Sequence, residues 1–181
     1  MHTAFTTANM LLPNSSIDYS KWSVIACDQY TSQPKYWQSV EDITKDSPST
    51  LNLILPEVYL NSNDCEDRIA NIHSTMNEYL TNGVFTEHKD CFVYVERTQS
   101  DGKVRKGLIG AIDLEQYDYT KGSTSQVRAT ESTVIERIPP RLKVRTNAPI
   151  ELTHIMILID DANNTVIEPI GNDKASLKSI Y

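Results

Sequence analysis

The residues best suited to chemistry lie together in one short stretch, from Lys121 to Thr146. This stretch carries six basic and two acidic side chains, a balance of +4, against 11 basic and 22 acidic side chains in the rest of the chain. The net charge of the whole protein is −7. A basic stretch within an acidic protein indicates a local anion site. The overall negative charge argues against a surface devoted to nucleic acid or to an anionic membrane, because phosphate is repelled at long range.

The stretch opens with four residues that suit a phosphate group, Gly122, Ser123, Thr124 and Ser125. Glycine permits a turn with positive φ that exposes successive backbone N–H groups, and the three hydroxyls add further donors. Arg128 follows closely and could hold a phosphate with two parallel hydrogen bonds. We therefore expect these five residues to bind a phosphorylated ligand.

The residues after this turn predict the start of a helix. Thr133 and Glu136 have the spacing of a capping box, and free N–H groups at a helix start favour an anion. Thr133 therefore joins the predicted ligand-binding residues. Pro139 and Pro140 are expected to end this helix.

Three further side chains complete the predicted site. Glu131 is the candidate acid or base, and Arg137 and Arg141 supply supporting positive charge. If the protein is an enzyme, we expect phosphoryl transfer to a small molecule, with ATP or ADP and Mg²⁺, because this reaction needs mainly positioning and charge stabilisation. The alternative is a non-catalytic regulatory module whose basic face binds nucleic acid or a protein partner, of which nucleic acid is not favoured.

Each of these features also has a purely structural interpretation. Gly-Ser-Thr-Ser is a common loop, capping boxes stabilise helices, and spaced arginines often form a solvated face. The stretch is not a Walker A motif, since no Gly-Lys-Ser/Thr follows at the required spacing. On the residues alone, both interpretations stay open.

A second candidate is the polar turn at Asp28, which the sequence places at the end of a strand. Asp28 could act as a general base or hold a metal, although a carboxylate that caps the turn is the favoured interpretation. Cys27 would be a nucleophile only with a nearby base that the sequence does not identify. With Cys65 and Cys91 it shows no metal-ligand spacing, so we expect no metal site and reduced thiols in a cytoplasmic protein.

Hydrophobic patterns predict the elements that position these residues. In the first half of the chain we expect a strand at Trp22–Ala26 and a helix from Gln33 with proline in its first turn. A second strand is expected at Thr50–Leu55. A long helix is expected from a cap at Asn63 with Glu66 three residues later, closed by asparagine and glycine.

The second half predicts two β-hairpins. The first joins Cys91–Thr98 to Val104–Leu114, where two glycines at 107 and 110 indicate a bulge or a close backbone approach. The second joins His154–Asp160 to Thr165–Ile170. Its turn begins with Asp160 and Asp161, which suit a turn better than a Mg²⁺ site.

Helices and hairpins that alternate along the chain predict an α/β or α+β fold, with a mixed sheet, β-hairpins and flanking helices. The length of 181 residues predicts a single domain over residues 1–181. No apolar window is long enough to span a membrane, and the N-terminus lacks a secretory signal.

Several runs resemble the family called domain of unknown function 1015. They are KWSVIACDQYTSQPKYW (Lys21–Trp37), GLIGAIDLEQYDY, KGSTSQVRATESTVIERIPPRLKVR, APIELTHIMILIDD and VIEPI. The resemblance covers the chain from about Lys21 to its C-terminus. Members of this family are longer, which implies that this chain is a fragment or a shortened member.

A weaker resemblance is to the ParB/sulfiredoxin-like fold, in which a small α/β unit holds nucleotide phosphates. It implies a nucleotide site and, as in some members, a free-serine kinase activity. Relatives in the family called domain of unknown function 1015 carry a Lys/Arg-x-His-Glu-x-Thr motif where this chain has Arg128–Thr133, so Thr130 takes the place of the histidine. They also carry a Pro-Pro-Tyr-Asp motif where this chain reads Ala26–Tyr30.

Overall fold

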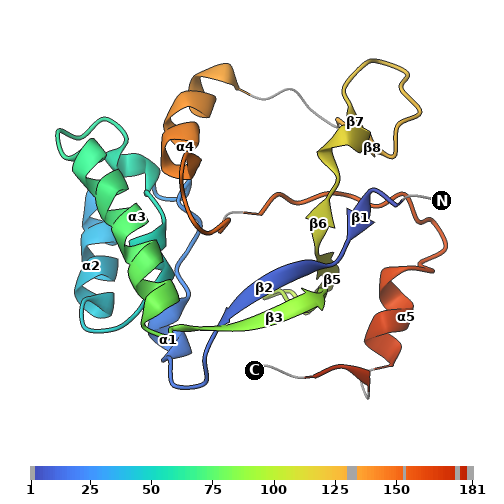
Figure 1. Ribbon diagram of the computed structural model, residues 1–181, viewed down its shortest axis with the longest axis horizontal. Helices are drawn as coiled ribbons and strands as arrows, with labels where there is room; N and C mark the ends of the chain where they lie inside the picture. Colours follow the sequence, from blue (N-terminus) through green and yellow to red (C-terminus); the bar gives the residue numbers. More distant parts are fainter. Residues whose placement is uncertain (1–2, 130–133, 153, 174–175, 179–181) are drawn as a thin grey trace. The chain divides into compact units, whose positions relative to one another are not determined.

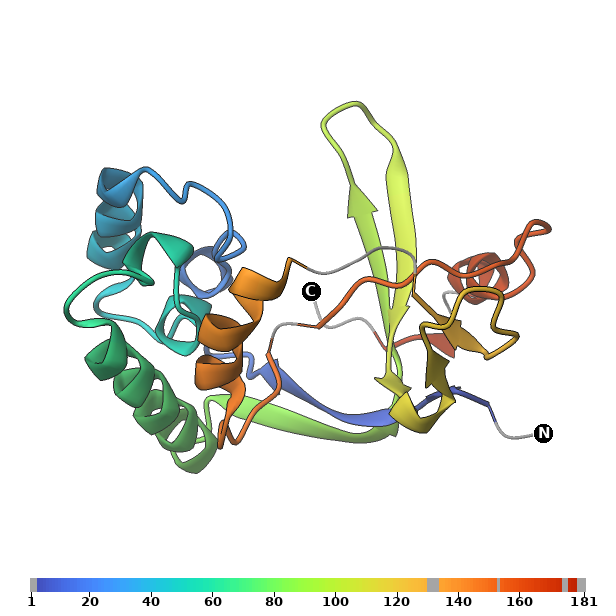
Figure 2. The ribbon, with the colours of Figure 1, turned by 90° about the horizontal axis from the view of Figure 1, so that it is seen from above.

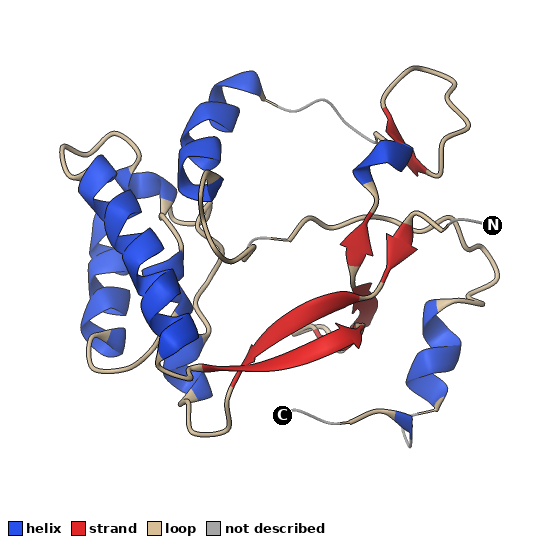
Figure 3. Ribbon diagram, viewed as in Figure 1, coloured by secondary structure: helices blue, strands red, loops and turns tan. Residues whose placement is uncertain are grey.

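The computed structural model describes residues 3–129, 134–152, 154–173 and 176–178. The chain divides into two compact units, each assembled from segments that are distant in sequence. The first unit contains residues 1–11, 87–132 and 156–181, and the second contains residues 12–86 and 133–155. Helices and short strands follow one another in blocks along the chain, and Figure 3 shows both kinds of element, which confirms the mixed α and β class with hairpins and flanking helices. The single domain stays a prediction.

The second unit is mainly helical. In it α3 contacts η1 and α4, while α2 contacts α1 and η1 (Figure 1). Its helices and 3₁₀ turns are α1 (Tyr19–Trp22), α2 (Pro34–Thr44), η1 (Thr50–Leu53), η2 (Glu57–Tyr59), α3 (Cys65–Thr81), η4 (Ile135–Arg137) and α4 (Ile138–Arg145).

Helix α3 supplies most of the core of this unit. Its apolar residues recur every three or four positions, so one face is buried. The helix ends at Asn82 and Gly83, as predicted, but it begins after Asp64 rather than Asn63, and no side chain caps its first turn. The buried cluster consists of Trp22, Leu53, Leu55, Ile69, Ile72, Met76, Tyr79 and Val84.

Two predicted strands of the second unit are wrong. The carboxylate of Asp18 accepts the N–H of Ser20 at 3.0 Å and starts α1, so the chain is helical up to Trp22. The hydroxyl of Ser49 likewise accepts the N–H of Leu51 at 3.2 Å and turns Thr50–Leu53 into a 3₁₀ helix. In both places a local side-chain cap replaces the strand partner that an extended segment needs.

The prolines of α4 are also placed differently from the prediction. Pro139 and Pro140 occupy the first turn of the helix instead of ending it. The first turn tolerates proline because its N–H groups have no partner within the helix.

The first unit contains short strand pairs and one short helix. The antiparallel pairs are β1–β6 and β4–β5, and β7 pairs with β8 in parallel. In addition β2 pairs with β3, and the boundary between the units falls within both of these strands. The bounds are β1 (Phe5–Thr6), β2 (Ala8–Pro13), β3 (Phe85–Cys91), β4 (Val93–Thr98), β5 (Val104–Ile109), β6 (Ala111–Ile112), β7 (Tyr117–Asp118), β8 (Val127–Arg128), with η3 (Leu114–Gln116) and α5 (Ile167–Asn172).

The hairpin β4–β5 confirms the first predicted hairpin and forms a long two-stranded ribbon (Figure 2). Its strand β5 stops before Gly110, where β1 comes very close. A Cβ atom at Gly110 would lie 2.6 Å from the carbonyl oxygen of Thr6 and 2.7 Å from the ring of Phe5. The predicted close backbone approach is therefore confirmed at this glycine, whereas Gly107 has open space around it.

The second predicted hairpin is wrong in its strands. Residues 154–160 form no strand, and the expected partner strand is largely helix α5. The turn between them does form. The carboxylate of Asp161 accepts the N–H groups of Thr165 at 2.7 Å and Val166 at 2.9 Å. These bonds lead the chain into a helix, and they confirm Asp161 as a turn residue.

Candidate functional site

The basic stretch is divided between the two units. Its part up to residue 132 belongs to the first unit, and its part from residue 133 belongs to the second. Glu131 and Thr133 lie outside the described residues. The backbone of Arg137 is part of η4, and its side chain is likewise outside the description.

The Gly-Ser-Thr-Ser segment forms the loop between β7 and β8. Gly122 has φ +83°, which confirms the predicted positive-φ turn. The N–H of Ser123 donates to the carbonyl of Thr120 at 3.0 Å, and the N–H of Ser125 donates to the hydroxyl of Ser123 at 3.1 Å. Two of the predicted donors are therefore used to hold the loop together.

Asp118, at the start of the loop, organises it further. Its carboxylate accepts the N–H of Thr120 at 2.8 Å. This bond, together with those from the side chains of Thr120 and Ser123, lowers the pKa of Asp118. The hydroxyl of Ser125 donates to the carbonyl of Gln116. The loop is thus closed by its own polar groups, with the carboxylate of Asp118 turned into it.

The two cations that flank this loop have no carboxylate partner among the described residues. Lys121 precedes Gly122 and is exposed, and Arg128 is exposed in β8. Asp118 is the register neighbour of Arg128 in the parallel pair, yet no ion pair joins them. Neither positive charge is therefore neutralised by a described carboxylate.

The cations of α4 are in a different situation, because each has a glutamate. Arg141 Nη2 lies 3.0 Å from Glu57 Oε1, and Arg145 Nη1 lies 2.7 Å from Glu151 Oε1. Lys143 pairs with Glu66. These contacts neutralise the helix locally and link α4 to other segments of the second unit.

The turn at Cys27 and Asp28 packs near one of these ion pairs. The N–H of Glu57 donates to the carbonyl of Cys27 at 2.8 Å. Burial raises the pKa of the Cys27 thiol, the carboxylates of Asp28 and Glu57 raise it further, and Arg141 lowers it. A thiol in this state is a poor nucleophile. Asp28 is exposed, and the side-chain amide of Gln29 donates to it at 3.3 Å.

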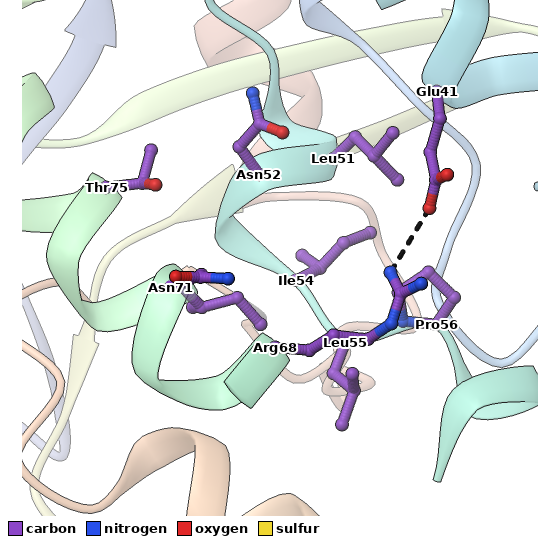
Figure 4. A pocket seen from close by; sticks show the side chains of 10 residues that line it. Glu41, Leu51, Asn52, Ile54, Leu55, Pro56, Arg68, Asn71 and Thr75 are labelled. Carbon is purple, nitrogen blue, oxygen red and sulfur yellow. Dashed lines mark hydrogen bonds and ion pairs between the residues drawn. The ribbon is translucent and has the colours of Figure 1, made fainter. Parts of the chain in front are cut away.

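A cavity of about 220 Å³ lies in the second unit between α2, η1 and α3. Arg68 reaches across it to Glu41, with 3.2 Å between Nη1 and Oε1 (Figure 4). The guanidinium also contacts Asp64 at 2.8 Å and covers the ring of Tyr59 at 3.7 Å. Arg68 is consequently fixed on three sides. Its contact with Asp64 follows from the i,i+4 spacing, whereas nothing in the sequence predicts its contacts with Glu41 and Tyr59.

The described part of the chain contains no group of three or more His, Cys, Asp or Glu side chains that could hold a metal ion. Within the same residues, no helix combines the length and the apolar character that crossing a membrane requires.

Comparison with known proteins identifies the family. Residues 11–180 match the family described as "Protein of unknown function (DUF1015)". The chain belongs to this family. No curated protein and no solved structure matches the chain. Membership of the DUF1015 family confirms the first resemblance, and the ParB/sulfiredoxin-like likeness stays a prediction.

In this member of the DUF1015 family, the predicted site residues fall into separate groups. Gly122, Ser123, Thr124, Ser125 and Arg128 lie together in the β7–β8 loop of the first unit. Arg141 lies in the second unit, beside the turn that carries Asp28, the other candidate catalytic residue. The proximity of Arg141 and Cys27 joins two segments that are more than a hundred residues apart, which no spacing rule predicts.

Proposed function

We propose that this protein binds a small phosphorylated ligand at the loop between β7 and β8, with a nucleotide as the preferred candidate. The observation that supports this proposal is the pair of exposed cations, Lys121 and Arg128, without a carboxylate partner among the described residues. An exposed guanidinium offers two parallel donors to a phosphate, and a lysine adds a mobile point charge.

The backbone of the loop adds donors to these two side chains. The N–H groups of Gly122 and Thr124 are not hydrogen-bonded to any described residue, unlike those of Ser123 and Ser125. The positive φ of Gly122 is typical of turns that present N–H groups to an anion. The ligand is therefore held by Arg128, Lys121 and these free N–H groups rather than by all four loop residues.

Helix α4 is the weaker place for the same ligand. An anion bound to Arg141 or Lys143 would compete with Glu57 or Glu66 for the same donors. Separating such a pair leaves a carboxylate next to the incoming phosphate, which repels it. At the loop no described ion pair has to be broken at Lys121 or Arg128, although the carboxylate of Asp118 lies within the same loop.

Phosphoryl transfer to a small molecule is the reaction class that this site would serve. ATP or ADP with Mg²⁺ is the expected cofactor, since Mg²⁺ is commonly held largely by the phosphates themselves. Glu131 follows Arg128 by three residues and is the candidate acid or base. Asp28 is the second carboxylate candidate.

Ligand-induced stabilisation tests the proposal. Thermal unfolding is measured with ADP, with ATP and Mg²⁺, and with pyrophosphate. A ligand at about 100 times its Kd stabilises the folded state by about 2.7 kcal/mol. We expect a concentration-dependent rise in Tm that Arg128→Ala abolishes and Lys121→Ala reduces.

Two control variants make this test specific. Lys103→Ala removes an equal charge from the same unit, at an exposed lysine paired with Asp101, and should keep the full response. Arg141→Ala should also keep it. The proposal fails if none of the three probes changes the Tm, or if Arg128→Ala responds like the unmodified protein. Salt-dependent binding of DNA or RNA, lost on combining Arg137→Ala with Arg141→Ala, would support the regulatory module instead.

A further inference from the structure

The cavity between α2, η1 and α3 combines apolar walls with a few polar groups, as small-molecule sites do. All of its lining residues lie between residues 41 and 75 of the second unit. Its volume of about 220 Å³ is below the roughly 300–1,000 Å³ of pockets for drug-sized molecules, so it suits a smaller ligand. The apolar lining consists of Leu51, Ile54, Leu55, Pro56 and Ile72.

Two polar side chains of α3 line the cavity, and neither is hydrogen-bonded to a described residue. They are Asn71 and Thr75, one helical turn apart. Farther along the helix, Asn77 and Thr81 have the same spacing but bond to their own helix, as such side chains often do. Asn77 Nδ2 donates to the carbonyl of His73 at 2.8 Å, and the Thr81 hydroxyl donates to the carbonyl of Asn77 at 3.1 Å. Asn71 and Thr75 therefore have donors and acceptors that no described residue uses.

The main chain at Leu55 is also unpaired. Leu55 is 5% exposed, and neither its N–H nor its C=O is hydrogen-bonded to another described residue. Buried backbone groups almost always have a partner, and because Leu55 lines the cavity, a molecule bound there can supply it. Leu55 precedes Pro56, which favours an extended backbone. In an extended chain the N–H and C=O of one residue point to the same side, so they match a partner that offers both on one edge.

The charged groups at the cavity already have partners. Glu41 and Arg68 lie 3.2 Å apart, and Arg68 also contacts Asp64 (Figure 4). A charged ligand has to separate these pairs or stay without a counter-charge, and an uncharged ligand avoids both costs. Asn52 adds an uncharged acceptor to the lining. Its Nδ2 donates to the hydroxyl of Tyr79 at 3.1 Å, whereas its Oδ1 has no described partner.

We propose that this cavity binds a small uncharged cyclic amide, of which a pyrimidine base is an example. A cyclic amide carries an N–H and a C=O on the same edge, and these complement the C=O and N–H of Leu55. Asn71 and Thr75 bond its other polar groups, while Ile54 and Ile72 supply apolar contact for the ring. The site lies in the second unit, apart from the β7–β8 loop of the first, and does not depend on the function proposed for that loop.

Titration of the protein with uracil, followed by NMR, tests the proposal. We expect saturable binding with a Kd of about 1 mM or tighter. Dimethyluracil, in which both ring N–H groups are methylated, should bind at least about fivefold more weakly, because it cannot donate to the C=O of Leu55. Amide hydrogen exchange locates the bound molecule. The N–H of Leu55 should exchange more slowly when uracil is present, since it then has a hydrogen-bond partner.

Paired variants on α3 test the two side chains. Asn71→Ala and Thr75→Val should each weaken the binding of uracil about fivefold, because each removes an uncharged hydrogen bond. Asn77→Ala and Thr81→Val are the matched controls, since they make the same changes on the same helix outside the lining of the cavity and should leave the Kd unchanged. Circular dichroism checks that all four variants are folded. Arg128→Ala should also leave the Kd for uracil unchanged, so this site and the phosphate site of the loop are tested separately.

Several results would overturn the proposal. Uracil that does not bind at about 1 mM, or dimethyluracil that binds equally well, excludes recognition of a cyclic amide. An unchanged exchange rate at Leu55, or equal effects of Asn71→Ala and Asn77→Ala, places the bound uracil outside the cavity. Equal binding of myo-inositol, a polyol without an amide, means that hydroxyl groups suffice and that the class of ligand is wrong.

Discussion

The two parts of the basic stretch use their positive charges differently. On α4, in the second unit, Arg141, Lys143 and Arg145 each contact a glutamate. Around the β7–β8 loop, in the first unit, Lys121 and Arg128 have no such partner among the described residues. Each of these side chains contributes the same charge in the sequence, but among the described residues only those around the loop lack a carboxylate partner.

The same contrast holds for apolar side chains. The second unit buries a cluster of eight residues around α3, including Trp22 and Tyr79. In the first unit, Ala4 is the only residue among the buried hydrophobic side chains described, while many apolar residues, such as Val95 and Leu158, are exposed. The second unit is therefore stabilised by a buried apolar core, whereas the described part of the first unit buries few apolar side chains.

Truncation of core residues should give the largest difference between the units. Ile72 is 5% exposed in the core, and Ile72→Ala should lower the free energy of unfolding by about 2–4 kcal/mol through lost burial and a residual cavity. Val95→Ala, on the exposed hairpin, should cost less than about 1 kcal/mol. Urea unfolding followed by tryptophan fluorescence and by circular dichroism measures both. Equal costs for the two variants would contradict the contrast.

Loss of Arg68, the side chain held by two carboxylates and a tyrosine ring, should lower the free energy of unfolding by a smaller amount. Arg68→Ala removes contacts with Glu41, Asp64 and the ring of Tyr59, and should cost about 1–2 kcal/mol at this partly exposed site. Lys103→Ala should cost almost nothing, since its pair with Asp101 is largely exposed.

A conservative change separates geometry from charge at this site. Arg68→Lys keeps the positive charge but loses the planar group that contacts both carboxylates and stacks on Tyr59, so it should recover only part of the stability. Denaturant unfolding of Arg68→Ala, Arg68→Lys and Lys103→Ala under identical salt conditions measures the stability that each variant loses, which should decrease in this order. Full recovery by lysine would mean that charge alone accounts for the effect.

The smallest expected effect concerns the thiol of Cys27. Burial and then the carboxylates of Asp28 and Glu57 raise its pKa. Alkylation by iodoacetamide should therefore begin at a higher pH than for free cysteine, and Glu57→Gln should move the midpoint down. Arg141→Ala should move it up, because Arg141 lowers the pKa.

The same thiol contributes to the dependence of stability on pH. Because the pKa of this thiol is raised in the folded state, its contribution to the free energy of unfolding is fully present at pH values below the ordinary pKa of a thiol. This contribution is lost as the pH rises through the pKa of the folded state. Mass spectrometry of the alkylated peptide follows the reaction, and Cys27→Ser identifies its signal. A midpoint at or below that of free cysteine would contradict the burial of this thiol.

The sequence predicted correctly those helices and turns that depend on interactions between neighbouring residues. The helical periodicity of α3, the early proline of α2 and the turn of the β4–β5 hairpin all act within a few residues, and all three elements are present. The strands at Trp22–Ala26 and Thr50–Leu55 were not found, because a strand depends on a distant partner. A nearby cap at Asp18 or Ser49 offers the backbone an alternative.

For the candidate site, the sequence by itself determined which residues carry the chemistry: a positive-φ glycine, hydroxyl groups and an excess of arginine and lysine between Lys121 and Thr146. Only the tertiary structure decided which of these positive charges are paired with a carboxylate. An ion pair such as Arg141 with Glu57 joins residues 84 positions apart, and its formation depends on packing that no local pattern encodes. Free cations and exposed apolar residues are thus properties of the fold, because each depends on what the rest of the chain leaves uncovered.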